Sequence, residues 1–227
     1  MKFKSALVTQ ASGSVGGMTA AHNKGGLYLR ARATPTNPAT AQQIAVRNFL
    51  ATLTTAWQET LTAAQREAWA TYAENVLIPD RLGEPRNIGG IGHYVRSNVP
   101  RLQAGLTRVD DGPTIFDQAT FTTPTLNAGD DESLTVNFTD TDAWVDETGA
   151  AMLVYASRQQ ALSINFFKGP YRFVDSIDGD DTTPPTTPAS PTSPFGLDTG
   201  NKQFYQVRVT RADGRLSPIV RTSALIV

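Results

Sequence analysis

Residues 202–215, KQFYQVRVTRADGR, decide the fold class of the C-terminal half because they join a strand pattern to a turn signal. Tyr205, Val207 and Val209 occupy every second position, which is the period of a half-buried strand. The Asp-Gly pair at 213–214 favours a tight hairpin turn, since Asp and Gly are the residues that such turns prefer. The stretch therefore predicts a strand that ends in a hairpin.

Similar short runs surround this stretch and are divided by turn-forming residues. They are SLTVNFTD (133–140), AAMLVYASR (150–158), YRFVDSID (171–178) and SPIVRTSALIV (217–227). Several such strands without any cysteine predict an immunoglobulin- or fibronectin III-like β-sandwich over residues 109–227. Within it, the Pro-rich residues 182–196 predict an extended surface loop, either an inert spacer or an arm that contacts a neighbour.

Residues 36–108 show helical periodicity instead and predict a small helical domain. Asn37 is a natural N-cap, and Pro38 suits the first helical position, where its missing N–H costs nothing. Thr62 and Gln65 match a capping box at the start of a second helix. With so short a connection, these two helices should pack as an antiparallel αα-hairpin. Their apolar stripes are Val46, Phe49, Leu50, Leu53 and Trp57, then Trp69, Tyr72, Ala73 and Val76.

A shorter third helix is expected over residues 89–99. Ile91, Tyr94 and Val95 would face inward. His93 lies one residue off that stripe, and neither a second His nor a carboxylate stands four residues away. We therefore expect His93 to be a surface or interface residue rather than a metal ligand.

Residues 11–32, ASGSVGGMTAAHNKGGLYLRAR, are rich in glycine and could suggest a phosphate-binding loop. A Walker loop needs a Lys directly after its second Gly, and a Rossmann fingerprint needs a helix after the glycines. Neither condition is met. The run NKGG at 23–26 instead predicts the turn of a β-hairpin in an extended arm, residues 1–35. Leu27 and Leu29 would share one face of this hairpin, and Tyr28, Arg30 and Arg32 the other.

The sequence contains no recognisable active site. It has no cysteine and only two histidines, which excludes thiolate zinc sites, disulfides and Cys nucleophiles. Ser12 stands where a G-x-S-x-G elbow needs its first glycine. Clustered aspartates are predicted to bond the backbone of their own turns, with a calcium site at Asp178, Asp180 and Asp181 as the sharper alternative. We predict that the protein is not an enzyme and carries no cofactor.

Charge is distributed unevenly along the chain. Residues 1–108 carry twelve Lys and Arg against five Asp and Glu, and residues 109–227 carry eight against sixteen. The six cations before Glu59 are too widely spread for a nucleic-acid surface, so we expect the basic half to face an acidic protein surface. We expect no membrane span and no secretory signal, and therefore assembly in a cytoplasm.

Two spaced motifs resemble those of a known group of proteins. Asn-Pro-x-Thr-x-x-Gln-x-x-x-Arg begins the first expected helix, and Leu-Thr-x-x-x-Arg-x-x-Trp begins the second. Their residues are Asn37, Pro38, Thr40, Gln43 and Arg47, then Leu61, Thr62, Arg66 and Trp69. With the Gly-rich hairpin, GHYVRSNVPRLQAGL (92–106) and FFKGPYRF (166–173), they resemble a group of phage and prophage proteins over nearly the whole chain. The resemblance implies a virion structural or virion-associated protein and brings no catalytic residues.

Together these observations predict an α+β protein of the virion that acts through protein–protein contacts, as a capsid decoration or as a neck or tail component. Its partners would be other virion proteins, in a homo-oligomer or on a lattice. The expected subunit interface comprises Gly16, Gly17, Tyr28, Arg30, Arg32, Asn37, Gln43 and Arg47. The alternative is an adhesion module that binds host-surface glycans or protein. Its contacts would be Trp144, Tyr155 and Tyr171, exposed near loop ends.

Overall fold

The computed structural model describes residues 11–23, 26–80 and 83–227. Contacts divide the chain into two compact units, one up to Ala41 and the other from Gln42 to Val227. Three α-helices and several antiparallel sheets make the protein an α+β protein. None of the helices in the described part of the chain is both long and apolar enough to cross a bilayer.

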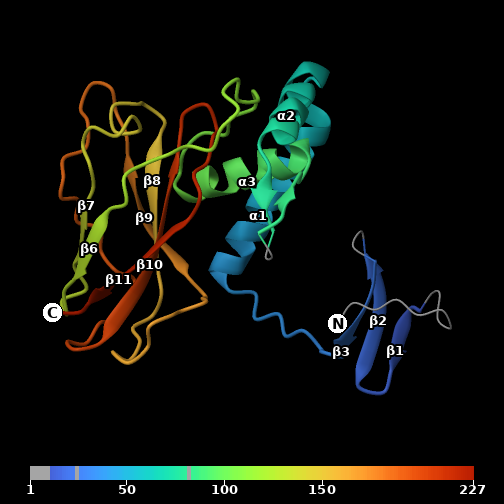
Figure 1. Ribbon diagram of the computed structural model, residues 1–227, viewed down its shortest axis with the longest axis horizontal. Coiled ribbons are helices and arrows are strands. Elements are labelled where there is room, and N and C mark those ends of the chain that lie inside the picture. Colours follow the sequence, from blue (N-terminus) through green and yellow to red (C-terminus); the bar gives the residue numbers. More distant parts are fainter. Residues whose placement is uncertain (1–10, 24–25, 81–82) are drawn as a thin grey trace. The chain divides into compact units, whose positions relative to one another are not determined.

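The N-terminal unit contains one three-stranded antiparallel sheet, called here the N-terminal sheet (Figure 1). The expected hairpin is its β2–β3 pair, and the two central turn residues, 24 and 25, lie outside the described residues. The first strand was not expected. It forms because Gly16 and Gly17 make a second tight turn, in which Gly16 has a φ of +57°. The strands are β1 (Gly13–Val15), β2 (Met18–Asn23) and β3 (Gly26–Ala31).

The first helix of the second unit, α1 (Ala41–Thr55), begins later than the sequence predicts. Asn37 is not its N-cap. The Asn37 side chain accepts a hydrogen bond from the backbone N–H of Ala39 at 3.3 Å, and Ala39 has a φ of +49°. A residue in the left-handed region cannot belong to a helix, so this local turn delays the start of α1.

The start of α2 (Ala63–Asn75) agrees with the prediction. Thr62 and Gln65 form a complete capping box. The backbone N–H of Gln65 donates to the Thr62 hydroxyl at 3.2 Å, and the backbone N–H of Thr62 donates to the side-chain oxygen Oε1 of Gln65 at 2.9 Å. The predicted stripe of this helix, which includes Trp69 and Tyr72, is buried. Because the cap fixes where the helix starts, it also fixes which face these aromatic residues occupy.

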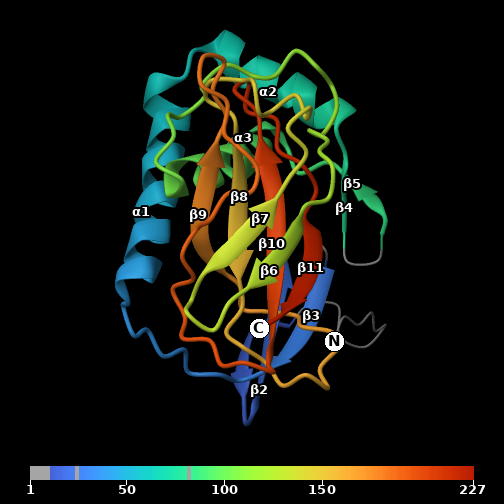
Figure 2. The same cartoon turned by 90° about the vertical axis from the view of Figure 1, so that its left-hand side faces the viewer.

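The expected antiparallel αα-hairpin is not formed. Figure 2 shows α1 along one side and α2 turning across the top, so the two helices diverge. A π-helical turn (Ala56–Thr60) and the extended backbone of Leu61 change the chain direction between them. Without α2 alongside, the stripe of α1 is buried only at Leu53, while Val46 and Leu50 are 40% and 47% exposed.

The remaining helix, α3 (Gly90–Gln103), is longer than expected and includes Pro100. A pair of antiparallel strands of two residues each, β4 (Ile78–Pro79) and β5 (Pro85–Arg86), precedes it. Tyr94 is buried as predicted, whereas Ile91 is exposed. This difference arises because α3 lies against α2 and against strand β10 (Lys202–Thr210), and these two elements cover a different side of the helix.

Antiparallel strands in two layers build the β region (Figures 1 and 2). One layer has the strand order β11-β10-β8-β9, and the other is the β6–β7 pair; one apolar core joins them. The alternation predicted for Tyr205, Val207 and Val209 is confirmed, because all three are fully buried. The strands are β6 (Thr125–Ala128), β7 (Leu134–Asn137), β8 (Ala151–Ala156), β9 (Arg172–Asp178), β10 (Lys202–Thr210) and β11 (Val220–Leu225).

Part of the Pro-rich stretch is neither a spacer nor a free arm. Residues 189–193 lie along β7 and exchange backbone hydrogen bonds with it. The N–H of Val136 donates to the Ala189 carbonyl at 2.8 Å, and the N–H of Leu134 donates to the Pro191 carbonyl at 3.2 Å. Prolines suit the edge of a sheet because they present no donor to solvent or to another chain. This segment therefore closes the free edge of β7.

The helices and the β region belong to the same compact unit, although the sequence predicted a domain boundary near residue 108. The guanidinium of Arg101 on α3 is buried and donates to the Thr107 carbonyl at 3.0 Å and to the Arg211 carbonyl at 2.7 Å. The indole N–H of Trp69 donates to the Asp110 carbonyl at 2.9 Å. These bonds join the helices to the β region, so the two parts pack as one body.

Candidate functional site

The residues expected at a subunit interface occupy two separate parts of the chain. On the N-terminal sheet, Tyr28 and Arg30 share a face with Ser14 and Thr19, since Thr19 is paired with both Ser14 and Arg30. Arg32 follows β3 and donates its backbone N–H to the Gly17 carbonyl at 2.8 Å. Gly16 and Gly17 form the turn, with no atom close to where a Cβ would be. On the other side of residue 41, Gln43 and Arg47 are exposed on α1. Their role as an interface stays a prediction.

The opposite face of the N-terminal sheet is apolar, and the sequence analysis did not identify it. Val15 pairs with Met18 and Met18 with Ala31, so these side chains point to one side together with Ala20, Leu27 and Leu29, and His22, which pairs with Leu27, is the polar residue among them. Within the described residues 11–23 and 26–41 no other segment covers this face, and Val15 and Met18 are 86% and 51% exposed. The alternation of polar Ser14 with apolar Val15 is a sequence signal for this face. The first strand is short, however, and the Gly-Gly pair that follows it is also typical of a loop.

Of the aspartates in residues 178–181, Asp180 stabilises its own turn, as predicted. The Asp180 carboxylate accepts hydrogen bonds from the backbone N–H groups of Thr183 at 2.9 Å and Thr182 at 2.7 Å, and these bonds lower its pKa. Asp181 accepts from the Thr148 hydroxyl at 2.7 Å. The described ranges hold no group of three or more His, Asp or Glu side chains that could bind a metal ion. The calcium alternative therefore gains no support.

His93 is not a surface residue, contrary to the expectation. It is fully buried and packs edge-on against Tyr72, with ring centroids 5.1 Å apart. Neither ring nitrogen makes a hydrogen bond of good geometry with any residue described by the structure. Burial, together with a smaller effect of the nearby Arg96 charge, lowers the pKa of His93 to about 4. His93 is thus a neutral core residue, because α3 is covered on more sides than a surface helix.

The three aromatic residues expected to contact a host receptor lie in different environments. Trp144 is fully buried and packs against Phe138 at 5.2 Å between ring centroids, so its predicted exposure is wrong. Tyr155 is half-buried, and its hydroxyl donates to the Gln103 side chain at 3.3 Å. Tyr171 lines an open pocket on the four-stranded sheet β11-β10-β8-β9. Trp144 lies in the turn between β7 and β8, and a large aromatic side chain can fill a core from a turn as well as from a strand.

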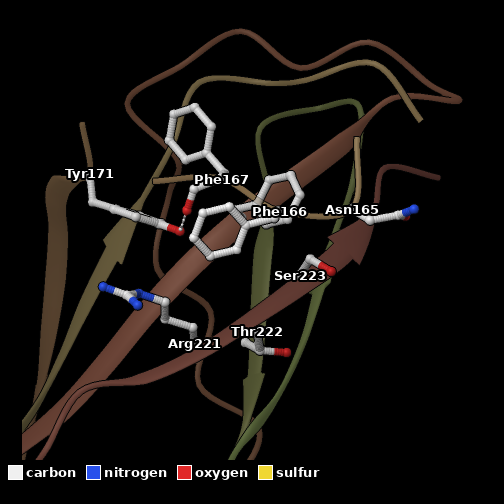
Figure 3. Close-up of a pocket in the computed structure, with 8 residues that line it drawn as sticks. Asn165, Phe166, Phe167, Tyr171, Arg221, Thr222 and Ser223 are labelled. Atoms are coloured by element: carbon white, nitrogen blue, oxygen red, sulfur yellow. Dashed lines mark hydrogen bonds between the residues drawn. The ribbon is translucent and has the colours of Figure 1, made fainter. Parts of the chain in front are cut away.

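This pocket, called here the aromatic pocket, lies where the β8–β9 loop approaches β10 and β11 (Figure 3). Its volume is about 290 Å³. Phe167 stacks on Phe204 with ring centroids 5.7 Å apart, and its backbone carbonyl accepts a hydrogen bond from the Tyr171 hydroxyl at 2.9 Å. The full lining is aromatic at Phe166, Phe167, Tyr171 and Phe204, and polar at Asn165, Arg221, Thr222 and Ser223.

Positive charge distinguishes the aromatic pocket from its surroundings. Its lining contains Arg221 and no carboxylate, although residues 109–227 carry sixteen acidic residues against eight basic ones. The ammonium of Lys202 lies 6.0 Å from the centroid of the Phe204 ring. Burial raises the pKa of Tyr171, and the Arg221 charge opposes that shift. The pocket therefore combines aromatic faces with a local cationic field.

Comparisons with protein-family models, curated proteins and solved structures return no match to this chain.

Proposed function

We propose that this protein is a non-enzymatic structural component of a phage particle, as a capsid decoration or a neck- or tail-associated protein. The uncovered apolar face of the N-terminal sheet is the observation that carries the proposal. A small sheet needs a covered hydrophobic face to be stable, and nothing within the described residues 11–23 and 26–41 provides the cover. A neighbouring subunit in an assembled particle would supply it, in a contact that orders the sheet as it binds.

Two further features fit this role. Residues 32–40 are exposed and have no regular secondary structure, which suits a connection to a docking element. The chain before Glu59 contains six cations and no acidic residue, which favours an acidic surface on the partner virion protein or on a second copy. In this proposal the β region is an immunoglobulin-like module. The two antiparallel layers around one core support that assignment.

The test compares neighbouring residues on opposite faces of β1. Val15→Asp places a charge on the apolar face, whereas the matched control Ser14→Asp places it on the polar face. We expect Val15→Asp to lower the copy number in purified particles at least tenfold, by mass spectrometry, because a buried unpaired charge strongly opposes docking. Ser14→Asp should assemble normally. Equal incorporation of the two variants would overturn the proposal.

A second readout uses the unaltered chain. Protease cleavage within residues 11–41 should be rapid in the free protein and blocked in the particle, because covering the sheet removes the exposed sites. Cleavage at the same rate in both states would also contradict the proposal.

A further inference from the structure

We propose that the aromatic pocket binds an acidic saccharide, through one sugar ring that carries a carboxylate. The proposal does not depend on where the protein assembles, since it concerns a surface at the far end of the chain from the N-terminal sheet. It rests on three observations: a fixed aromatic floor, polar side chains without partners, and a cationic field without a carboxylate.

The aromatic floor is built rather than accidental. Phe167 is held between Phe204, which it stacks on at 24° between ring planes, and Tyr171, which meets it edge-on at a centroid distance of 5.4 Å. Beside this cluster, Phe166 leaves 71% of its surface exposed. An apolar ring that lines a pocket and remains in water gains free energy when a ligand with an apolar face covers it. The C–H face of a sugar ring is such a surface.

Polar groups stand at both ends of this floor. Figure 3 shows Arg221 on the Tyr171 side and Asn165 and Ser223 on the other. Within the described ranges these three side chains form no hydrogen bond or ion pair with the protein. They are therefore free to bond the hydroxyl groups that surround a sugar ring. Arg221 can form a paired hydrogen bond to a carboxylate.

Size and charge select among possible ligands. A volume of about 290 Å³ is at the lower end of small-molecule pockets, which suits one ring rather than an extended peptide. A nucleotide could also stack on the floor. The phosphate groups of a polyphosphate or nucleic-acid chain would however carry more negative charge than the single guanidinium in the lining, that of Arg221, can pair with. One carboxylate beside one guanidinium fits the charge better.

The test uses the full-length chain on an array of acidic and neutral oligosaccharides. The acidic probes carry glucuronic, galacturonic or N-acetylneuraminic acid, the neutral probes carry glucose or galactose, and single-stranded DNA serves as a further probe. We expect binding to the acidic sugars only. The dissociation constant should rise about tenfold or more in Arg221→Gln, which loses a charged hydrogen bond, and similarly in Phe166→Ala, which loses the apolar contact.

Matched controls keep the result interpretable. Leu162→Ala removes another exposed apolar side chain of the same loop, and Arg86→Gln removes an exposed guanidinium on β5. Both should bind as the unaltered protein does. Phe166→Trp should retain binding, because it keeps an aromatic face. The proposal is overturned by the absence of acidic-sugar binding at millimolar concentration, by equal binding of neutral sugars, by preference for the DNA probe, or by equal loss in the control variants.

Discussion

The N-terminal sheet and the β10–β11 region are both built from antiparallel strands with alternating apolar residues, but only the second buries them. Val15 and Met18 are mostly exposed on the N-terminal sheet, whereas Tyr205 and Val207 are fully buried. The difference is the presence of a covering layer. β10 has β6 and β7 over its apolar face, and the described residues 11–23 and 26–41 contain no second layer. The alternation of apolar residues along a strand therefore indicates which face of the sheet is apolar, and a second layer must bury that face.

The largest expected contrast comes from removing one apolar side chain in each of the two compact units of the chain. Trp69→Ala should lower the free energy of unfolding by about 3–5 kcal/mol, because Trp69 is fully buried between helices and its indole N–H bonds the Asp110 carbonyl. Val15→Ala should change it by less than about 0.5 kcal/mol. Urea unfolding followed by circular dichroism measures both. A large effect of Val15→Ala in the free chain would mean that its face is already covered.

Acid should destabilise the main unit, residues 42–227, through His93. Its pKa in the folded protein is about 4, below the unfolded value of 6.5, so the unfolded chain binds the proton first. The stabilisation is full above pH 6.5 and is lost as the pH falls toward 4, by up to about 3 kcal/mol. The fall between pH 7 and pH 4 should be smaller in His93→Phe by this amount. An equal fall in His93→Phe and in the unaltered protein would contradict this expectation.

The Asp-Gly turn tests how closely the two halves of the main unit are fitted. Gly214 has a φ of +88°, and a Cβ there would lie 3.3 Å from the Trp69 side chain. Gly214→Ala should therefore lower the free energy of unfolding by about 1–3 kcal/mol from backbone strain, with the contact adding to it. Gly200→Ala is the matched control, since Gly200 has a φ of +84° and no atom within 4 Å of the added Cβ. Equal melting temperatures of the two variants would show that the Trp69 side chain moves aside without a cost in stability.

The smallest expected effect concerns the local signal that the sequence predicts best. Thr62→Ala removes the capping box of α2 and should lower the free energy of unfolding by about 1 kcal/mol. Thr71→Ala changes an exposed Thr inside the same helix and should have little or no destabilising effect. Differential scanning calorimetry resolves the difference. Similar destabilisation by both variants would imply that Thr62 does not act as a cap.

The candidate surfaces could be predicted only in part. The Gly-rich hairpin, its polar Tyr28 and Arg30 and the acidic turns follow from local patterns. Tyr171 was among the expected contacts, yet its pocket depends on Phe204 and Arg221 from distant strands. Trp144 was placed on the surface because periodicity identifies strands but cannot tell which loop residue fills the core. Tertiary packing decides that.

The sequence by itself determined the features that depend on neighbours along the chain: the cap at Thr62, the alternation around Val207 and the Asp-Gly turn at 213–214. These rely on backbone hydrogen bonds and side-chain periods within a few residues. The tertiary structure alone decided that α1 and α2 diverge, that His93 is buried, and that residues 189–193 close the edge of β7. Each of these depends on a partner far away in the sequence, and burial is a property of what covers a residue.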